Sequence, residues 1–125
     1  MFDHVKFGVR DYAVSKAFYL QALAPLGVLK GGEGEPSYGV ELYIDGQMAT
    51  LCLFETKEKP AHLHIAFAAQ TREQVDAFYR EVLAAGGTDN GPPGLRPKYH
   101  ANYYAAFVID PDGHNIEAVC HAAPT

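Results

Sequence analysis

The sequence predicts a mixed α+β domain assembled from two copies of one β-α-β-β-β module. Three observations support this prediction: an internal repeat, a strand pattern followed by a helix pattern in each half, and two turn sequences that suit hairpins. With 125 residues, 48% hydrophobic and 20% charged, the chain is large enough for one compact domain. We therefore expect a single domain over residues 1–125, with modules at about 1–56 and 62–122 and a linker at about 57–61.

The repeat is visible when the sequence is compared with itself at an offset of 60 positions. Eight residues are then identical over 24 positions without a gap. The first copy holds these at His4, Phe7, Ala17, Phe18, Tyr19, Leu23, Ala24 and Gly27, and the second at His64, Phe67, Ala77, Phe78, Tyr79, Leu83, Ala84 and Gly87. Because several of these residue types are uncommon, chance is a poor explanation and a duplicated unit is favoured.

Each copy opens with a strand and continues with a helix. Residues 4–9 and 64–69 alternate in polarity, which indicates strands. In the second copy Thr71 and Gln74 form a capping-box pair, and the helix is expected to stop at Gly86 and Gly87. Its apolar positions follow the helical period at Val75, Phe78, Tyr79, Val82 and Leu83. The first helix is expected to start after the N-cap Asp11, to end near Pro25, and to direct inward Val14, Ala17, Phe18 and Leu23.

Strand pairs follow each helix. Residues 38–44 and 49–54 flank an Asp45-Gly46 turn, and residues 103–109 and 115–120 flank the turn at 110–113. A further, weaker strand is expected near Val28 in one half and near Thr88 in the other. One such module has too little sheet to bury a face alone, so two must pack together with a cavity between them.

Charge and composition exclude several partners. The net charge is −5 with no basic run, which argues against nucleic acid, and no apolar stretch approaches the roughly 20 residues that span a bilayer. Asp3 and His4 lie where a signal peptide would carry positive charge and then an apolar segment, so we expect no signal peptide here. Cys52 and Cys120 lie in apolar runs, which is typical of reduced cysteines. We expect a cytoplasmic protein.

Three residues are candidate metal ligands. His4 and His64 occupy equivalent positions in the repeat, and Glu117 lies in an apolar strand where a carboxylate is costly to bury unless it is paired or bound to a metal. Two imidazoles and one carboxylate would form a facial set with open positions for substrate. His62 shares the strand face of His64 and competes for the role, although the offset of 60 favours His64. The alternative is that these side chains simply face water.

The loop at 91–104 gathers polar and aromatic residues before a strand. Tyr99, His100 and Tyr103 could bind a small polar or anionic ligand at the rim of a cavity, or their rings could pack on a sheet edge. His114 lies in a turn and His121 near the end of the chain, and both are expected to be solvated.

Four segments together resemble one known family. They are 3–11, 15–19, 64–67 and the motif D-P-D-G-H-N-I-E at 110–117. They are similar to the vicinal oxygen chelate superfamily, which includes glyoxalase I, extradiol dioxygenases, and fosfomycin- and bleomycin-resistance proteins. The resemblance covers essentially the whole chain. It implies paired βαβββ modules forming a cup-shaped mixed sheet, with His4, His64 and Glu117 as ligands of a divalent ion and Glu117 also in a catalytic role.

The resemblance leaves the activity open. Glyoxalase I usually adds a glutamate in the last strand of its first module, where this chain has Cys52, a thiol that cannot replace the carboxylate as a proton-shuttling base. Cys52 is therefore kept as a candidate substrate-binding residue. The ligand set does not choose among zinc, iron, manganese and nickel.

Two functions of different classes follow. The first is a metal-dependent enzyme, a lyase or isomerase or a dioxygenase, acting on a small substrate with two adjacent oxygens. The alternative is a non-catalytic ligand- or drug-binding module of the bleomycin-resistance type; a dimer with a vestigial site is a third, weaker possibility. The resemblance also implies a homodimer, since chains of this size in the family commonly pair.

Overall fold

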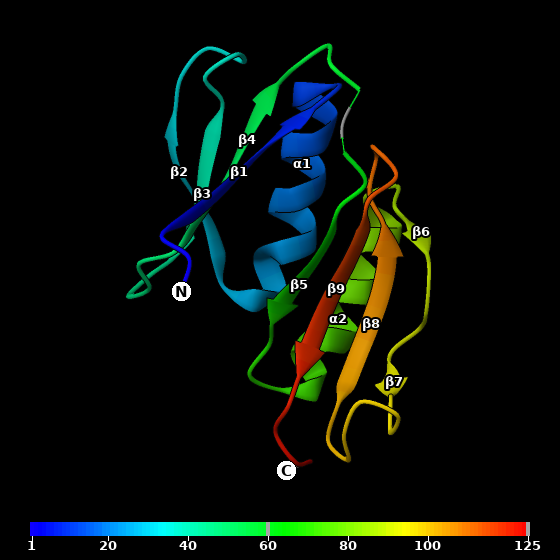
Figure 1. Cartoon of the computed structure of the whole chain (residues 1–125). Helices are drawn as coiled ribbons and strands as arrows, with labels where there is room; N and C mark the ends of the chain where they lie inside the picture. Colours follow the sequence, from blue (N-terminus) through cyan, green and yellow to red (C-terminus); the bar gives the residue numbers. More distant parts are fainter. Residues whose placement is uncertain (60, 125) are drawn as a thin grey trace.

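The computed structural model contains two mixed sheets and two long helices (Figure 1). It describes residues 1–59 and 61–124. Position 60, inside the predicted linker, and position 125 lie outside the described residues. None of the helices in the described part of the chain has the length and apolar character needed to cross a membrane.

The first sheet has strand order β1-β4-β3-β2, with β1 parallel to β4 and the other pairs antiparallel. Its strands are β1 (His4–Val9), β2 (Val28–Glu33), β3 (Val40–Ile44) and β4 (Thr50–Glu55). The helix α1 (Tyr12–Leu23) and the short 3-10 helix η1 (Ala24–Leu26) connect β1 to β2.

The second sheet repeats this order as β5-β9-β8-β6, again with its first two strands parallel, while β7 pairs with β8. Its strands are β5 (His64–Ala68), β6 (Thr88–Asp89), β7 (Gly94–Leu95), β8 (Tyr104–Ile109) and β9 (Asn115–Cys120). The helix α2 (Arg72–Ala84) follows β5. The predicted α+β class with paired modules is confirmed, including the weak strands near Val28 and Thr88.

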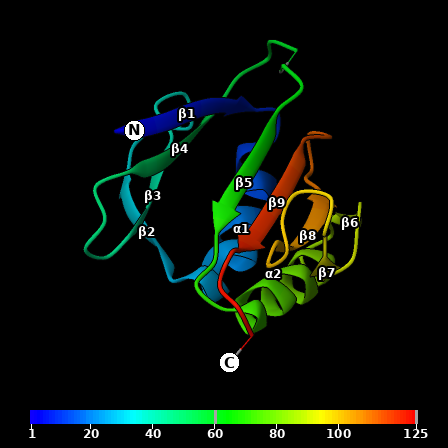
Figure 2. The ribbon, with the colours of Figure 1, turned by 60° about the horizontal axis from the view of Figure 1, so that its bottom comes forward.

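The two helices share one core between the sheets. α1 packs on the first sheet and α2 on the second, and the helices contact each other. Figure 2 shows the two sheets splaying outward from this helical layer. Each sheet therefore has one face in the core and one open face. In β1 the alternation places Phe7 and Val9 in the core and His4 and Lys6 on the open face.

The predicted caps are present. The Asp11 carboxylate accepts a hydrogen bond from the Val14 backbone N–H at 3.2 Å, and Thr71 and Gln74 form both bonds of the capping box. The inward face predicted for the first helix is wrong at Val14 and Ala17, which are exposed, and Leu83 of α2 is 42% exposed. The buried residues of α1 are Tyr12, Ser15, Phe18, Tyr19, Ala22 and Leu23.

The buried face of α1 differs from the predicted one because two polar side chains of this helix have hydrogen-bond partners inside the protein. Tyr19 is fully buried, and its hydroxyl donates to the Asp110 carboxylate in the turn between β8 and β9. Ser15 reaches Asp112 in the same turn at 3.4 Å. Burial raises the pKa of Tyr19 far above its ordinary value, and the Asp110 charge adds to the effect. The first module is thus joined to the second by hydrogen bonds as well as by apolar packing.

This bond predicts a stability difference between two tyrosines of the same helix. Tyr19→Phe removes the donor to a buried carboxylate and is expected to lower the free energy of unfolding by about 2 kcal/mol. Tyr12→Phe is the matched control, because the Tyr12 hydroxyl donates at 2.5 Å to Glu33, whose side chain is 25% exposed, so this bond should matter less. Urea unfolding of both variants measures the difference. Equal losses would contradict an inter-module role for Tyr19.

Candidate metal and ligand site

The open face of the second sheet brings together the two predicted ligands His64 and Glu117, with Phe107 beside them. Strand register pairs Ala66 of β5 with Glu117 of β9, and Glu117 with Phe107 of β8. His64 begins β5, two residues before Ala66, so its side chain lies on the same face as Glu117. His64 Nε2 donates to Glu117 Oε1 at 2.9 Å.

Glu117 is a buried carboxylate with both oxygens engaged. The residue is only 2% exposed, whereas the His64 side chain is 52% exposed. The second carboxylate oxygen accepts a hydrogen bond from the Tyr103 hydroxyl. A buried carboxylate needs such partners because its desolvation is otherwise very costly. His64 and Tyr103 therefore supply the partners that a carboxylate in this apolar strand needs.

The predicted loop at 91–104 folds back toward this face (Figure 2). The Arg96 guanidinium lies 5.3 Å from the centre of the Phe107 ring and donates to the Pro92 carbonyl at 2.7 Å. Tyr99 packs against Tyr103 with ring centres 4.8 Å apart. The loop thus supplies the hydroxyl that reaches Glu117.

Two histidines extend the aromatic group around Tyr103. The His100 ring lies 5.4 Å from the Tyr103 ring, and the His121 ring lies 5.2 Å from it. The His100 and His121 imidazoles share a hydrogen bond of 2.5 Å between Nε2 and Nδ1. Three predicted ligand-binding residues, Tyr99, His100 and Tyr103, therefore cluster beside Glu117. Sequence reasoning missed His121, although its place just after the strand of Glu117 was a usable signal.

His4 and Cys52 lie on the open face of the other sheet. Register pairs His4 with Thr50 and Lys6 with Cys52. Cys52 therefore holds in the first sheet the position that Glu117 holds in the second, opposite the residue two places after the histidine. The Nδ1 of His4 lies 2.7 Å from the Asp3 carboxylate, which fixes the ring through one nitrogen and leaves Nε2 for another partner.

Within residues 1–59 and 61–124, no group of three or more His, Cys, Asp or Glu side chains is placed to hold a metal ion. His4 does not join His64 and Glu117 inside one chain. His62, the rival to His64, lines a separate cavity with Arg10 and is not hydrogen-bonded to Glu117.

The expectation that His114 is solvated is wrong. It is 1% exposed. Its ring Nδ1 accepts a hydrogen bond from the Leu63 backbone N–H, and its backbone N–H donates to the Asp110 carboxylate. His121 is exposed, as expected.

The ligand atoms His64 Nε2 and Glu117 Oε1 fit part of a divalent metal site. Ligand bonds of about 2.0–2.2 Å place two neighbouring ligands of one ion about 3 Å apart, close to the 2.9 Å observed between Nε2 and Oε1. An imidazole and a carboxylate also suit zinc, iron, manganese and nickel alike. Two ligands are too few for a stable protein site, so a third must come from elsewhere.

Fold and site together define a protein of paired β-α-β-β-β modules with a histidine–carboxylate pair on an open sheet face. The chain matches the family model Glyoxalase/Bleomycin resistance protein/Dioxygenase superfamily over residues 1–118. It belongs to that superfamily, as the sequence resemblance implied. No curated protein matches the chain.

Solved structures agree with this assignment. A glyoxalase/bleomycin resistance protein from Albidiferax ferrireducens T118 is 34% identical, with 98% of this chain and 99% of that chain covered and a TM-score of 0.82. The hypothetical protein SA1046 from S. aureus is 25% identical, with 96% and 95% covered and a TM-score of 0.69. A lactoylglutathione lyase from Agrobacterium tumefaciens shares the fold at 17% identity, with 96% and 92% covered and a TM-score of 0.71.

The site predicts an unusual titration of Tyr103. Burial, together with the hydrogen bond to the Glu117 carboxylate and the charge of that carboxylate, raises the pKa of Tyr103 to about 12. Because the folded-state pKa lies above the ordinary value of 10, the neutral phenol contributes stability below pH 10. That contribution is lost as the pH rises through about 12.

Phenolate absorbance of the wild type minus that of Tyr103→Phe isolates this group. The difference curve should have its midpoint near pH 12 in the folded protein and near pH 10 in denaturant. A folded-state midpoint near pH 10 would mean that Tyr103 is not held against Glu117.

Proposed function

We propose that this chain is a metal-dependent enzyme in which His64 and Glu117 bind a divalent ion that takes a small substrate with two adjacent oxygens. The observation that carries the proposal is the buried Glu117 carboxylate, aimed at the open face and paired there with a half-exposed imidazole. A carboxylate that is buried on the open face of a sheet, despite the free-energy cost of its desolvation, is typical of a functional site. When bound, the ion would act as a Lewis acid that stabilises negative charge developing on substrate oxygens.

The surrounding residues would orient the substrate and hold protons. The Tyr103 hydroxyl stays protonated at neutral pH and donates to Glu117, so it fixes the carboxylate and limits its rotation. Tyr99 and His100 pack on the Tyr103 ring and would contact an organic substrate from the side of the loop. Glu117 is the catalytic candidate as well as a ligand, since it is the buried carboxylate on this face.

A second copy of the chain would complete the site with His4. The first sheet offers a matching half-site: His4 has one nitrogen held by Asp3, and its side chain is 58% exposed. Cys52 lies on the same face at the position equivalent to Glu117 and would contact substrate there. A homodimer that joins the two open faces would bring His4 of one copy to His64 and Glu117 of the other, which accounts for the incomplete set within one chain.

The reaction class is a lyase, an isomerase or a dioxygenase. The family includes such enzymes, and a lactoylglutathione lyase shares the fold. Cys52 at the position equivalent to Glu117 argues against a mechanism that needs a second carboxylate base there. Zinc, iron, manganese and nickel remain candidates. Both cysteines are free, which supports the proposal of a cytoplasmic protein.

A non-catalytic ligand-binding role is the second candidate. It is favoured by the aromatic group beside Glu117, in which Tyr99, Tyr103 and Phe107 offer stacking surfaces for a flat ligand. A binder of this type does not need a metal, so metal content separates the two functions.

Metal content of protein purified without chelator or affinity tag tests the enzyme proposal. We expect near-stoichiometric divalent metal in the wild type and loss of most of it in His64→Ala, since one ligand is removed. His62→Ala is the matched control, because His62 lies two residues from His64 but lines a separate cavity, while the histidine bonded to Glu117 is His64, and this variant should keep its metal. A wild type that neither carries metal nor takes up zinc, manganese, nickel or ferrous iron would favour the binding module.

Mixing two inactive variants tests whether the site spans two chains. His4→Ala and His64→Ala homodimers should each lose metal, while a hybrid dimer made by co-refolding contains one intact site. The expected result is recovery of metal binding to about a quarter of the wild-type level, because about half of the dimers are hybrids and each has one of two sites. If one chain supplied all ligands, no mixture would recover metal.

A further inference from the structure

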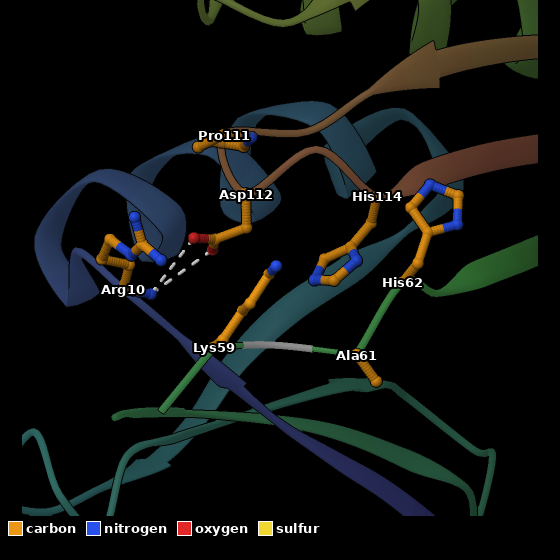
Figure 3. Close-up of a pocket in the computed structure, with 7 residues that line it drawn as sticks. All are labelled: Arg10, Lys59, Ala61, His62, Pro111, Asp112 and His114. Carbon is orange, nitrogen blue, oxygen red and sulfur yellow. Dashed lines mark hydrogen bonds between the residues drawn. The ribbon is translucent and has the colours of Figure 1, made fainter. Parts of the chain in front are cut away.

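A cavity lies where the two modules meet, and it shares no residue with the proposed metal site on the second sheet. Its volume is about 300 Å³. Its lining comes from the end of β1, the segment before β5 and the turn between β8 and β9 (Figure 3). The lining residues are Arg10, Lys59, Ala61, His62, Pro111, Asp112 and His114.

His114 places an unpaired hydrogen-bond donor in this cavity. Its Nδ1 accepts a hydrogen bond from the Leu63 backbone N–H at 3.1 Å, so Nδ1 carries no proton and the proton lies on Nε2. Nε2 is buried and has no hydrogen-bond partner among the described residues. Figure 3 shows the ring directed toward the space between Lys59 and Asp112. A buried donor without a partner is costly, so a group with an acceptor is expected beside it.

The tautomer of His114 decides which kind of group fits. A metal ion would need the lone pair of Nε2, but that nitrogen carries the proton while the Nδ1 lone pair is used by Leu63. The cavity therefore excludes a metal at His114 and requires an acceptor atom, such as the oxygen of an anion or of water.

The charges around the cavity favour an anion. The side chains of Arg10 and Lys59 form no ion pair with any residue in the described ranges. Asp112 is the one acidic residue in the lining. Its oxygens already accept bonds from the Arg10 backbone N–H at 3.3 and 3.4 Å and from the Ser15 hydroxyl at 3.4 Å. Two cations and one carboxylate give the lining residues one net positive charge.

We propose that this cavity binds a phosphate group, with His114 Nε2 donating from the buried end and Arg10 and Lys59 supplying the charge at the mouth. A tetrahedral oxyanion offers oxygens to an inner N–H and to two cations at once, and guanidinium–phosphate contacts are among the strongest hydrogen bonds in proteins. Inorganic phosphate and the phosphate of a small ester share this chemistry.

Histidine-selective nuclear magnetic resonance on the intact protein tests the proposal. Titration with inorganic phosphate, and separately with glycerol phosphate, should shift the His114 Nε2–H signal in a saturable way. Lys59→Gln should weaken the affinity about tenfold or more. Lys57→Gln is the matched control, because it removes the same charge from the same segment outside the cavity and should change the affinity less than about twofold.

The outcomes separate cleanly. Tighter binding of the ester identifies an organic phosphate, and equal binding identifies free phosphate; either supports the site. No saturable shift of His114, or equal weakening by the two lysine variants, would overturn it. Arg10→Gln serves as a second variant if Lys59→Gln does not fold. The result does not depend on the metal site, because neither His64 nor Glu117 lines this cavity.

Discussion

The Asp110 carboxylate is the group on which the arrangement of both modules depends. One of its oxygens accepts the backbone N–H groups of Asp112 and His114 at 3.0 and 2.8 Å, and the other accepts the buried hydroxyl of Tyr19. The same carboxylate therefore shapes the turn before β9 and attaches that turn to helix α1 of the other module. A buried charge with three donors is stable only when all of them stay in place, which makes this junction specific.

Both proposed sites depend on that junction. The turn fixes where β9 begins, and with it the register that directs Glu117 to the open face beside His64. The same turn buries His114 and leaves its Nε2 facing the inter-module cavity. One face of β9 thus serves the proposed metal site, while the loop that precedes the strand serves the proposed phosphate site.

The two sheets present related but unequal open faces. The second has His64, Glu117 and the tyrosine loop, whereas the first has His4 and, in place of the carboxylate, Cys52. A duplicated module that keeps the histidine twice and the carboxylate once would supply three protein ligands to the proposed metal site in each pair of faces. In the proposed homodimer this asymmetry leaves coordination positions for substrate, a requirement for metal-assisted chemistry.

The sequence by itself determined the two long helices and the longer strands, because their signals are local: alternation in residues 4–9, the capping box at Thr71 and the glycine stop at Gly86 each act within a few residues. The offset of 60 and the closing motif also singled out His64 and Glu117 as candidate ligands. In the structure His64 Nε2 lies 2.9 Å from Glu117 Oε1. Only the tertiary structure decided which face of α1 is buried and where His114 lies. Both depend on long-range hydrogen bonds: Tyr19 to Asp110 between the modules, and Leu63 to His114 within the second module, with partners 91 and 51 positions apart. No periodicity within one element encodes a contact at that separation, so burial of polar side chains had to be read from the packed modules.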